Sequence, residues 1–337
     1  MTHLAAAQSL RAALVADAAR VEADGVSRGD LKPLVEAGLY GLYAPPELGG
    51  SSDAAEQRQV AELLAGSGQD VWFLWFQHSP VLRMTATTAN EGLRDRYLSG
   101  LANGELMGGV SYSHLRNDKP GILAVRDGED FLLTGRQPWV TGWGINDLIV
   151  VGAVVPDSDE IVFGLIPSGD GPGVASAGLL ELAAMNGTVT HSVLYDAHRL
   201  PADHVLNVLP RKDFLAIDAL SNANVQPSTF GIALAALDLM EGETGDVLRE
   251  RVLDVRARAY HLLDEVPGHE QIEERLALRA QALLLGIDCA TALLTESGGK
   301  GMGLGHPAQR LLRAASFQVI HSQATGIRAA TLAALRA

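Results

Sequence analysis

The sequence predicts an α+β protein of three domains: an N-terminal helical domain (1–105), a central antiparallel, β-barrel-like domain (106–206) and a C-terminal helical bundle (207–337). In the first and last parts of the chain, apolar residues recur every three or four positions, which is typical of helices with one buried face. Near Met107 this spacing gives way to short β-branched runs separated by turn sequences, and these indicate strands.

The N-terminal domain begins with a helix from Leu4 to Val21, because its apolar residues fall on one face. We expect Asp30 to cap a second helix, with Pro33 in its first turn, where the missing N–H costs little. Gly38 can end this helix by adopting a left-handed conformation. Two further helices are expected at 56–66 and 91–101.

The central domain opens with a hairpin, because Asp127-Gly128 supplies the positive φ angles that a two-residue turn requires. The strands on either side would span 122–126 and 131–134. The β-branched runs 148–155 and 161–166 predict a second hairpin, and 189–195 predicts another strand.

The C-terminal domain returns to alanine- and leucine-rich helices, which we expect at 232–240, 246–263 and 271–294. One last helix would start at Pro307, since proline suits the first helical position. Its apolar stripe continues to Leu332, so a single helix is expected to reach the end of the chain.

Composition limits the classes of function. A net charge of −14 argues against nucleic-acid binding, which needs a basic surface to neutralise phosphates. The single cysteine, Cys289, cannot form a disulfide within the chain, and no His/Cys cluster has zinc-ligand spacing, so no metal site is expected. Apolar stretches such as Leu148–Val155 fall short of the roughly 20 residues of a membrane-spanning helix. We therefore expect a cytoplasmic protein with no membrane partner and no export signal.

Two segments resemble the acyl-CoA dehydrogenase family. Gly38 followed by Ala44–Gly50 (Ala-Pro-Pro-Glu-Leu-Gly-Gly) resembles the Gly, Pro-Glu, Gly-Gly signature of the family's N-terminal domain, although loop punctuation alone would also explain it. Leu133–Thr141 (Leu-Thr-Gly-Arg-Gln-Pro-Trp-Val-Thr) resembles the β-domain segment in which Gly and a basic residue precede Trp-Ile-Thr. The resemblance implies that Trp139 lies against the isoalloxazine edge of FAD and that Thr141 hydrogen-bonds the flavin. A tryptophan buried for packing remains the alternative.

Further segments follow in the family's order. Gly109–Asp118 occupies the place of its Thr-Glu-Pro, Gly-Ser-Asp segment, so Ser111 would stand for the threonine that faces the flavin pyrimidine. Val193–Pro201 resembles its exit strand. A glycine-rich segment, followed by Pro307, resembles the Gly-Gly-x-Gly segment that in the family approaches the adenine side of FAD bound to a neighbouring subunit, although a plain helix C-cap is the alternative. Its glycines are Gly298, Gly299 and Gly301.

The chain departs from the family where the family keeps its catalytic glutamate. The expected place after Arg313 reads Ile320-His321-Ser322-Gln323, and the alternative place reads Ala219-Leu220-Ser221-Asn222, so neither offers a carboxylate. Asp218 is near the second place but would ordinarily be a surface residue. His321, one position before the expected carboxylate, is the candidate catalytic base, because histidine titrates near working pH. A packed or solvent-facing histidine is the alternative.

A second departure concerns the FAD pyrophosphate. The family's arginine segment after the first helix of the third domain is replaced by Glu241–Gly245 (Glu-Gly-Glu-Thr-Gly). In the family this arginine reaches the pyrophosphate across a subunit interface, so FAD affinity and catalytic competence are both open for this chain.

Three functions are compatible with these features. The first is an FAD-dependent oxidoreductase that oxidises an acyl thioester or related substrate by hydride transfer to flavin, and passes electrons to an electron-transfer flavoprotein. The second is a flavin-dependent monooxygenase on the same fold, which needs no base for an α proton. The third is a non-catalytic partner subunit of a heteromeric flavoenzyme. A cofactor shared between subunits would require a homo- or hetero-oligomer.

Overall fold

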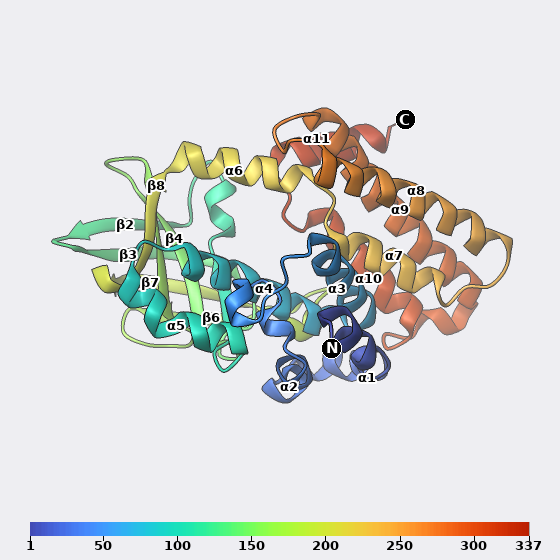
Figure 1. Cartoon of the computed structure of the whole chain (residues 1–337), viewed down its shortest axis with the longest axis horizontal. Coiled ribbons are helices and arrows are strands. Elements are labelled where there is room, and N and C mark those ends of the chain that lie inside the picture. The colour runs from blue at the N-terminus through green and yellow to red at the C-terminus, as the bar shows by residue number, and fades with distance from the viewer. Residues whose placement is uncertain (337) are drawn as a thin grey trace.

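Helices form both ends of the chain and strands form the middle, as the sequence predicts. The structure, a computed structural model, describes residues 1–336. In Figure 1 the sheet lies at one side, and most helices of the two ends lie together at the other. The helices are α1 (His3–Asp24), α2 (Arg28–Glu36), α3 (Ala54–Ser67), α4 (Gln69–Thr87), α5 (Glu91–Asn103), α6 (Arg211–Ala223), α7 (Pro227–Leu237), α8 (Glu243–Glu265), α9 (Ile272–Ser297), α10 (Pro307–Ile320) and α11 (Thr325–Ala334).

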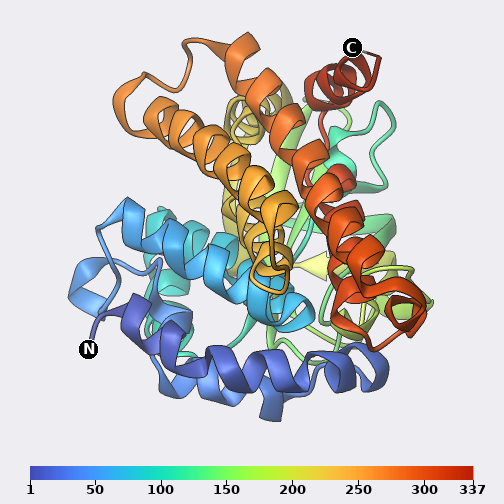
Figure 2. The ribbon, with the colours of Figure 1, turned by 90° about the vertical axis from the view of Figure 1, so that its right-hand side faces the viewer.

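The helices of both ends share one hydrophobic core, to which α1, α3, α4 and α7 to α10 all contribute. Two glycines let α3 and α7 cross with their backbones in contact. A Cβ at Gly66 would lie 2.6 Å from the carbonyl oxygen of Gly231, and a Cβ at Gly231 would lie 2.0 Å from that of Glu62. In Figure 2, α8 and α9 run side by side on the face toward the reader, with α1 crossing below them.

The sheet is mixed, which corrects the prediction of a purely antiparallel domain. Its strands follow the order β6-β7-β3-β2-β4-β5-β8, and both β1 and β2 pair with β4 in parallel. The two predicted hairpins are confirmed as β2–β3 and β4–β5. The strands are β1 (Gly108–Ser111), β2 (Ile122–Asp127), β3 (Asp130–Val140), β4 (Leu148–Val155), β5 (Glu160–Pro167), β6 (Val174–Leu179), β7 (His191–Leu200) and β8 (Val205–Pro210).

Strand β4 is buried along its whole length because the sheet has a core on each face. One core lies within the sheet domain, and the other lies between the sheet and α4 and α5. The proposed domain boundaries at 105 and 206 remain a prediction, and β8 crosses the second of them.

The cap of α2 differs from the predicted one. Ser27 is the N-cap, and Asp30 is the third helical residue of a capping box, in which its carboxylate accepts a hydrogen bond from the backbone N–H of Ser27 at 2.8 Å. Pro33 consequently lies in the middle of the helix rather than in its first turn. Gly38 has a φ of 71°, which confirms its predicted left-handed conformation.

The periodicity did not predict α4, although this helix lies at the centre of the molecule. Residues of its first half are buried on every side, including Trp72, Phe73 and Trp75. A helix buried all round has no polar face, so the alternation used to recognise helices is missing. Pro80 inside it adds a second signal against a helix.

The predicted last helix is two helices. α10 ends at Ile320 and α11 begins at Thr325, so the apolar stripe continues across a break. Within this break Ser322 has a φ of 51°. The stripe could not reveal the break because both helices pack against α9.

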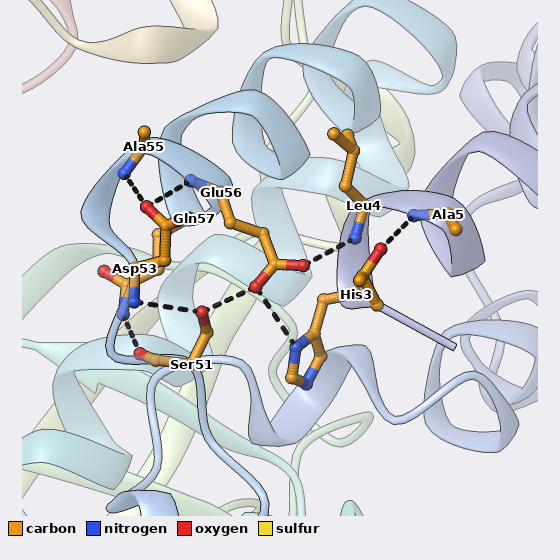
Figure 3. A network of polar contacts seen from close by, with 9 residues as sticks. His3, Leu4, Ala5, Ser51, Asp53, Ala55, Glu56 and Gln57 are labelled. Atoms are coloured by element: carbon orange, nitrogen blue, oxygen red, sulfur yellow. Dashed lines mark hydrogen bonds and ion pairs between the residues drawn. The ribbon is translucent and has the colours of Figure 1, made fainter.

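A polar network joins the start of α1 to the loop before α3 (Figure 3). Glu56 accepts hydrogen bonds from the backbone N–H of Leu4 at 3.2 Å and from the hydroxyl of Ser51 at 2.6 Å, and its carboxylate lies 3.8 Å from His3 Nδ1. Asp53 caps α3 through the N–H groups of the first turn. The Ser51 hydrogen bond is the main cause that lowers the pKa of Glu56. The network therefore fixes the loop that follows the Ala44–Gly50 segment.

One stretch, Ile272–Met302, is long and apolar enough to cross a membrane, with a mean hydropathy of 1.5. Its helix, α9, packs against α7, α8, α10 and α11. The 18-residue apolar window is 56% buried inside the fold. These contacts identify α9 as the core helix of the C-terminal bundle.

Candidate functional site

Ser111 lies at the end of β1 and is fully buried. Its hydroxyl is 3.0 Å from the hydroxyl of Tyr195 on β7, and either group can donate. Burial raises the pKa of Tyr195 to about 12, so the phenol keeps its proton at neutral pH. Because β7 pairs with β3, this hydrogen bond places Ser111 beside the strand that carries Trp139.

Trp139 and Thr141 lie at the end of β3 and differ in exposure. The Trp139 side chain is 54% exposed, so it is not the core residue that the packing alternative requires. Thr141 is buried, and its hydroxyl lies 3.2 Å from that of Thr190. Strand β1, which carries Ser111, contacts β3 without pairing with it, so the exposed Trp139 ring and the two buried hydroxyl groups belong to the same region of the sheet domain.

The glycine segment lies in the helical bundle. Gly298 ends α9 with a φ of 57°, and its N–H donates to the carbonyl of Thr295, so the C-cap role is real. Among the described residues, no atom lies within 4 Å of a Cβ placed on Gly298 or Gly299. Gly301 is different, because a Cβ there would come within 2.7 Å of Leu294. The first two glycines thus leave open space, while the third is required by packing.

His321 caps the C-terminal end of α10 and packs within an aromatic cluster made with α4. Its ring stacks on Phe317 at a centroid distance of 5.1 Å, and it meets Phe73 and Phe76 edge-on at 5.2 and 5.5 Å. Trp72 completes the cluster at 6.2 Å. We call these five residues the aromatic cluster. Trp72 and Phe73 are buried, whereas the other three are partly exposed, so the cluster opens on one side.

Burial keeps His321 neutral. Burial first, and then the charges of Arg279 and Arg116, lower its pKa to about 3. Arg279 is itself 1% exposed and donates to the His321 carbonyl at 3.0 Å. Within residues 1–336, His321 Nδ1 is buried and has no hydrogen-bond partner. His321 is therefore packed among aromatic rings, as the alternative to a catalytic role predicts. Packing does not explain why its Nδ1 atom lacks a hydrogen-bond partner.

Asp218 on α6 is half-buried rather than a surface residue. Its carboxylate accepts two hydrogen bonds from Arg116, both at 2.7 Å, and a third from Asn222 at 2.9 Å. Arg116 belongs to the segment after β1, so this pair joins the sheet domain to α6. Both carboxylate oxygens are engaged, which makes Asp218 a poor replacement for a free catalytic base.

The ring end of FAD fits the residues present, whereas its pyrophosphate end does not. Each hydroxyl of Ser111 and Thr141 has one proton and two lone pairs, so the hydrogen bonds that they make with Tyr195 and Thr190 leave capacity for a flavin atom. The exposed Trp139 ring offers an apolar face. By the resemblance, Glu241 and Glu243 replace the segment that carries the family's pyrophosphate-binding arginine, and their negative charge would be unfavourable there.

Comparisons with known proteins agree with this architecture. Residues 2–105 match the family model described as acyl-CoA dehydrogenase, N-terminal domain. Cyclohexane-1-carbonyl-CoA dehydrogenase of Geobacter metallireducens is 23% identical over 97% of this chain and 94% of its own. Butyryl-CoA dehydrogenase from Megasphaera elsdenii superposes with a TM-score of 0.80 at 17% identity, covering 99% of this chain and 97% of that one. The chain thus resembles acyl-CoA dehydrogenases in the sequence of its N-terminal domain and has their fold over its whole length.

A further member of this structural family has been solved with reduced flavin. A glutaryl-CoA dehydrogenase from Mycobacterium smegmatis in complex with FADH2 has a TM-score of 0.77 and 17% identity, covering 99% of this chain and 93% of that one. Acyl-CoA dehydrogenases are FAD-dependent oxidoreductases, and the relatives named here are enzymes. The predicted recognition and fold are thus confirmed, apart from the mixed sheet.

Sequence reasoning missed the α4 side of the aromatic cluster and the two arginines beside it. Trp72-Phe73 and Trp75-Phe76 gave a signal, since two aromatic pairs fall one helical turn apart. Arg279 also gave one, because an arginine among alanines and leucines in a core helix is rarely buried without a functional or capping role. The partnership of Arg116 with Asp218 joins positions 102 residues apart and had no local signal.

Proposed function

We propose that this protein is an FAD-dependent oxidoreductase that acts on an acyl thioester or a related substrate. The observation that carries the proposal is the exposed Trp139 ring at the end of β3, in the same sheet region as the buried hydroxyl groups of Ser111 and Thr141, within a fold similar to that of acyl-CoA dehydrogenases. FAD, when bound, supplies the acceptor for a hydride from the substrate. The acyl-CoA substrates named for the relatives support a thioester.

We propose His321 as the catalytic residue, because it replaces the family's missing carboxylate by position and keeps a neutral ring. A base works best when its pKa is near the working pH. With a pKa of about 3, His321 is a weak base, so proton abstraction should be slow. The protein would therefore be a sluggish dehydrogenase for ordinary acyl groups, or would act on substrates with an unusually acidic α proton.

A second candidate is a flavin-dependent monooxygenase. The observation that favours it is the lack of a free carboxylate at the two positions considered, since Asp218 is held by Arg116. Oxygen transfer from a reduced flavin does not need a base for an α proton. The unsuitable pyrophosphate end similarly favours the third candidate, a non-catalytic subunit that completes a flavin site with a second chain.

The electron acceptor and the assembly are proposed on the family resemblance, and the location on the composition of the sequence. We propose an electron-transfer flavoprotein as the acceptor, a homo- or hetero-oligomer as the assembly, and the cytoplasm as the location. Size measurement of the purified protein, alone and with co-purified partners, tests the assembly directly.

The test of the proposed function is the visible spectrum of the purified protein, with identification of any cofactor released on denaturation. Bound FAD that bleaches when an acyl-CoA is added without oxygen would support the dehydrogenase. Oxygen consumption with a flavin reductase, without anaerobic bleaching, would transfer the assignment to the monooxygenase. Failure to bind FAD even when it is supplied would overturn both and leave the partner subunit.

A further inference from the structure

Two tryptophans on α4, three residues apart, differ in one respect. Each is 1% exposed, so both indole rings are in the core. Trp75 donates its N–H to the carbonyl of Leu39 at 2.8 Å. The N–H of Trp72 is buried and finds no acceptor in the part of the chain that the structure describes, residues 1–336. We call such a group a free donor.

A free donor inside a protein needs an explanation. Burying an N–H group without a hydrogen bond costs about 1–3 kcal/mol, and native proteins contain few such groups. Trp72 could have been phenylalanine at this position without losing a hydrogen bond to the protein. A ligand or a water molecule could supply the acceptor that the described residues do not.

Other polar atoms without partners gather around the same cluster. His321 Nδ1 belongs to the ring that meets Trp72 at 6.2 Å. Gln318 lies three residues earlier on α10, on the same face, and its side-chain N–H2 is a second free donor, while its oxygen accepts from Ser228 at 2.8 Å. Arg279 Nε, next to the His321 carbonyl, is a third. All four groups can donate an N–H, since neutral imidazole can carry its proton on Nδ1.

The cluster is reachable from outside. Phe76, Phe317 and His321 are partly exposed, so a ligand that touches these rings stands next to Trp72. The charge nearby favours an electron-rich group, because Asp218 pairs with Arg116, whereas the recorded hydrogen bonds of Arg279 go to backbone carbonyls. An oxygen that only accepts hydrogen bonds suits this environment better than a hydroxyl or an amine.

We propose that Trp72, together with His321, forms a binding subsite for an acceptor oxygen, a ketone carbonyl or a carboxylate, on the acyl part of the substrate. The inference deepens the proposed function and rests on it. Trp72 thus determines specificity: an acyl chain without such an oxygen leaves the donor unsatisfied, and one that carries it gains a buried hydrogen bond.

The experiment compares Trp72→Phe with Trp75→Phe, a control that removes the same atoms from the same helix. Binding of hexanoyl-CoA, its 4-oxo and 5-oxo analogues and glutaryl-CoA is measured by calorimetry on the FAD-supplemented protein. The wild type should bind at least one oxygen-bearing ester about tenfold more tightly than hexanoyl-CoA. Trp72→Phe should abolish this preference, and Trp75→Phe should retain it. The oxo esters and glutaryl-CoA separate a carbonyl from a carboxylate as the preferred group.

Thermal denaturation gives the second measurement. Trp72→Phe should leave the denaturation midpoint higher than Trp75→Phe does, because only the control loses an internal hydrogen bond. Equal binding of all esters by the wild type would show that an ordered water occupies the donor, and would overturn the inference. A preference that survives Trp72→Phe would overturn it as well. If no ester binds, the proposed function fails with it, a result distinct from binding without preference.

Discussion

At the scale of single residues, His321 combines a position in the family's catalytic segment with surroundings that suppress its charge. An ordinary histidine changes charge near pH 6.5. Aromatic rings on two helices and two guanidinium groups move this change far lower, to a pKa of about 3. The imidazole of His321 therefore stays neutral throughout the physiological pH range.

We expect kcat/KM to show no step near pH 6.5 that is attributable to His321. His321→Gln should lower turnover at least a hundredfold if the ring takes the substrate proton, because that is the usual scale of general base catalysis. FAD content should not change. His261→Gln, an exposed histidine on α8, is the control. Normal turnover in His321→Gln would remove this residue from the mechanism.

Trp139 allows a second test at this scale. Trp139→Ala should reduce the FAD retained after gel filtration by about tenfold, because the exposed ring supplies the apolar face for the flavin. Leu123→Ala, which also removes an exposed apolar side chain from a strand, should retain FAD as the wild type does. Equal FAD content in both variants would contradict the assignment of Trp139.

The candidate flavin-binding residues were predictable because they lie in short segments whose residue order resembles that of the family. Ser111, Trp139 and Thr141 all come from two such segments, and the structure places them on β1 and at the end of β3, two strands that contact each other. The aromatic cluster was not predictable, since its members come from α4 and α10, more than 200 residues apart. Only the packing of those two helices brings Phe73 and Phe317 to a centroid distance of 4.9 Å.

At the scale of elements, the crossing of α3 and α7 depends on the absence of side chains. Gly231→Ala should lower the free energy of unfolding by about 1–3 kcal/mol, because its Cβ would meet the carbonyl of Glu62 and push the helices apart. Gly92→Ala is the matched control: it lies in α5, is exposed, and its Cβ would have its nearest neighbour at 3.8 Å. Chemical denaturation compares the two. A Gly231→Ala variant as stable as Gly92→Ala would mean that the helices can separate freely.

The elements that the sequence predicted best are helices with one buried and one polar face, and strands joined by a recognisable turn. α1, the two hairpins and α9 all follow from periodicity or turn chemistry. α4 was missed because nearly all of its first three turns are inside. The parallel pairing of β1 and β2 with β4 was also missed, since adjacency in the chain favours hairpins and carries no information about crossover connections.

At the scale of the whole molecule, two buried histidines, His78 and His114, and the partly exposed His321 make stability depend on pH. Burial lowers the pKa values of His78 and His114 to about 4 and that of His321 to about 3. Between pH 6.5 and these values the unfolded chain binds protons that the folded chain does not, so stability is lost as the pH falls. His78 and His114 also bridge backbone groups in their neutral form, through Leu101 and Gly108 and through Gly152 and Gly121.

Each histidine should cost about 2 kcal/mol between pH 7 and pH 5. Asp70 acts in the opposite direction, because burial raises its pKa to about 7 and its folded form takes up a proton as the pH falls. We expect a net loss of stability in urea denaturation at pH 5 compared with pH 7. Asp70→Asn should make this loss steeper, and a shallower pH dependence in that variant would contradict the opposing role of Asp70.

The shared core of the two helical ends has a consequence for how the protein is made. α3 cannot bury its glycine face until α7 exists, and the sheet domain separates them by more than 150 residues of chain. During synthesis on the ribosome, the first hundred residues must therefore wait, with apolar surface uncovered, for the last third of the protein. An isolated fragment ending near residue 105 should aggregate, and chaperones should associate with the nascent chain until α7 to α10 emerge.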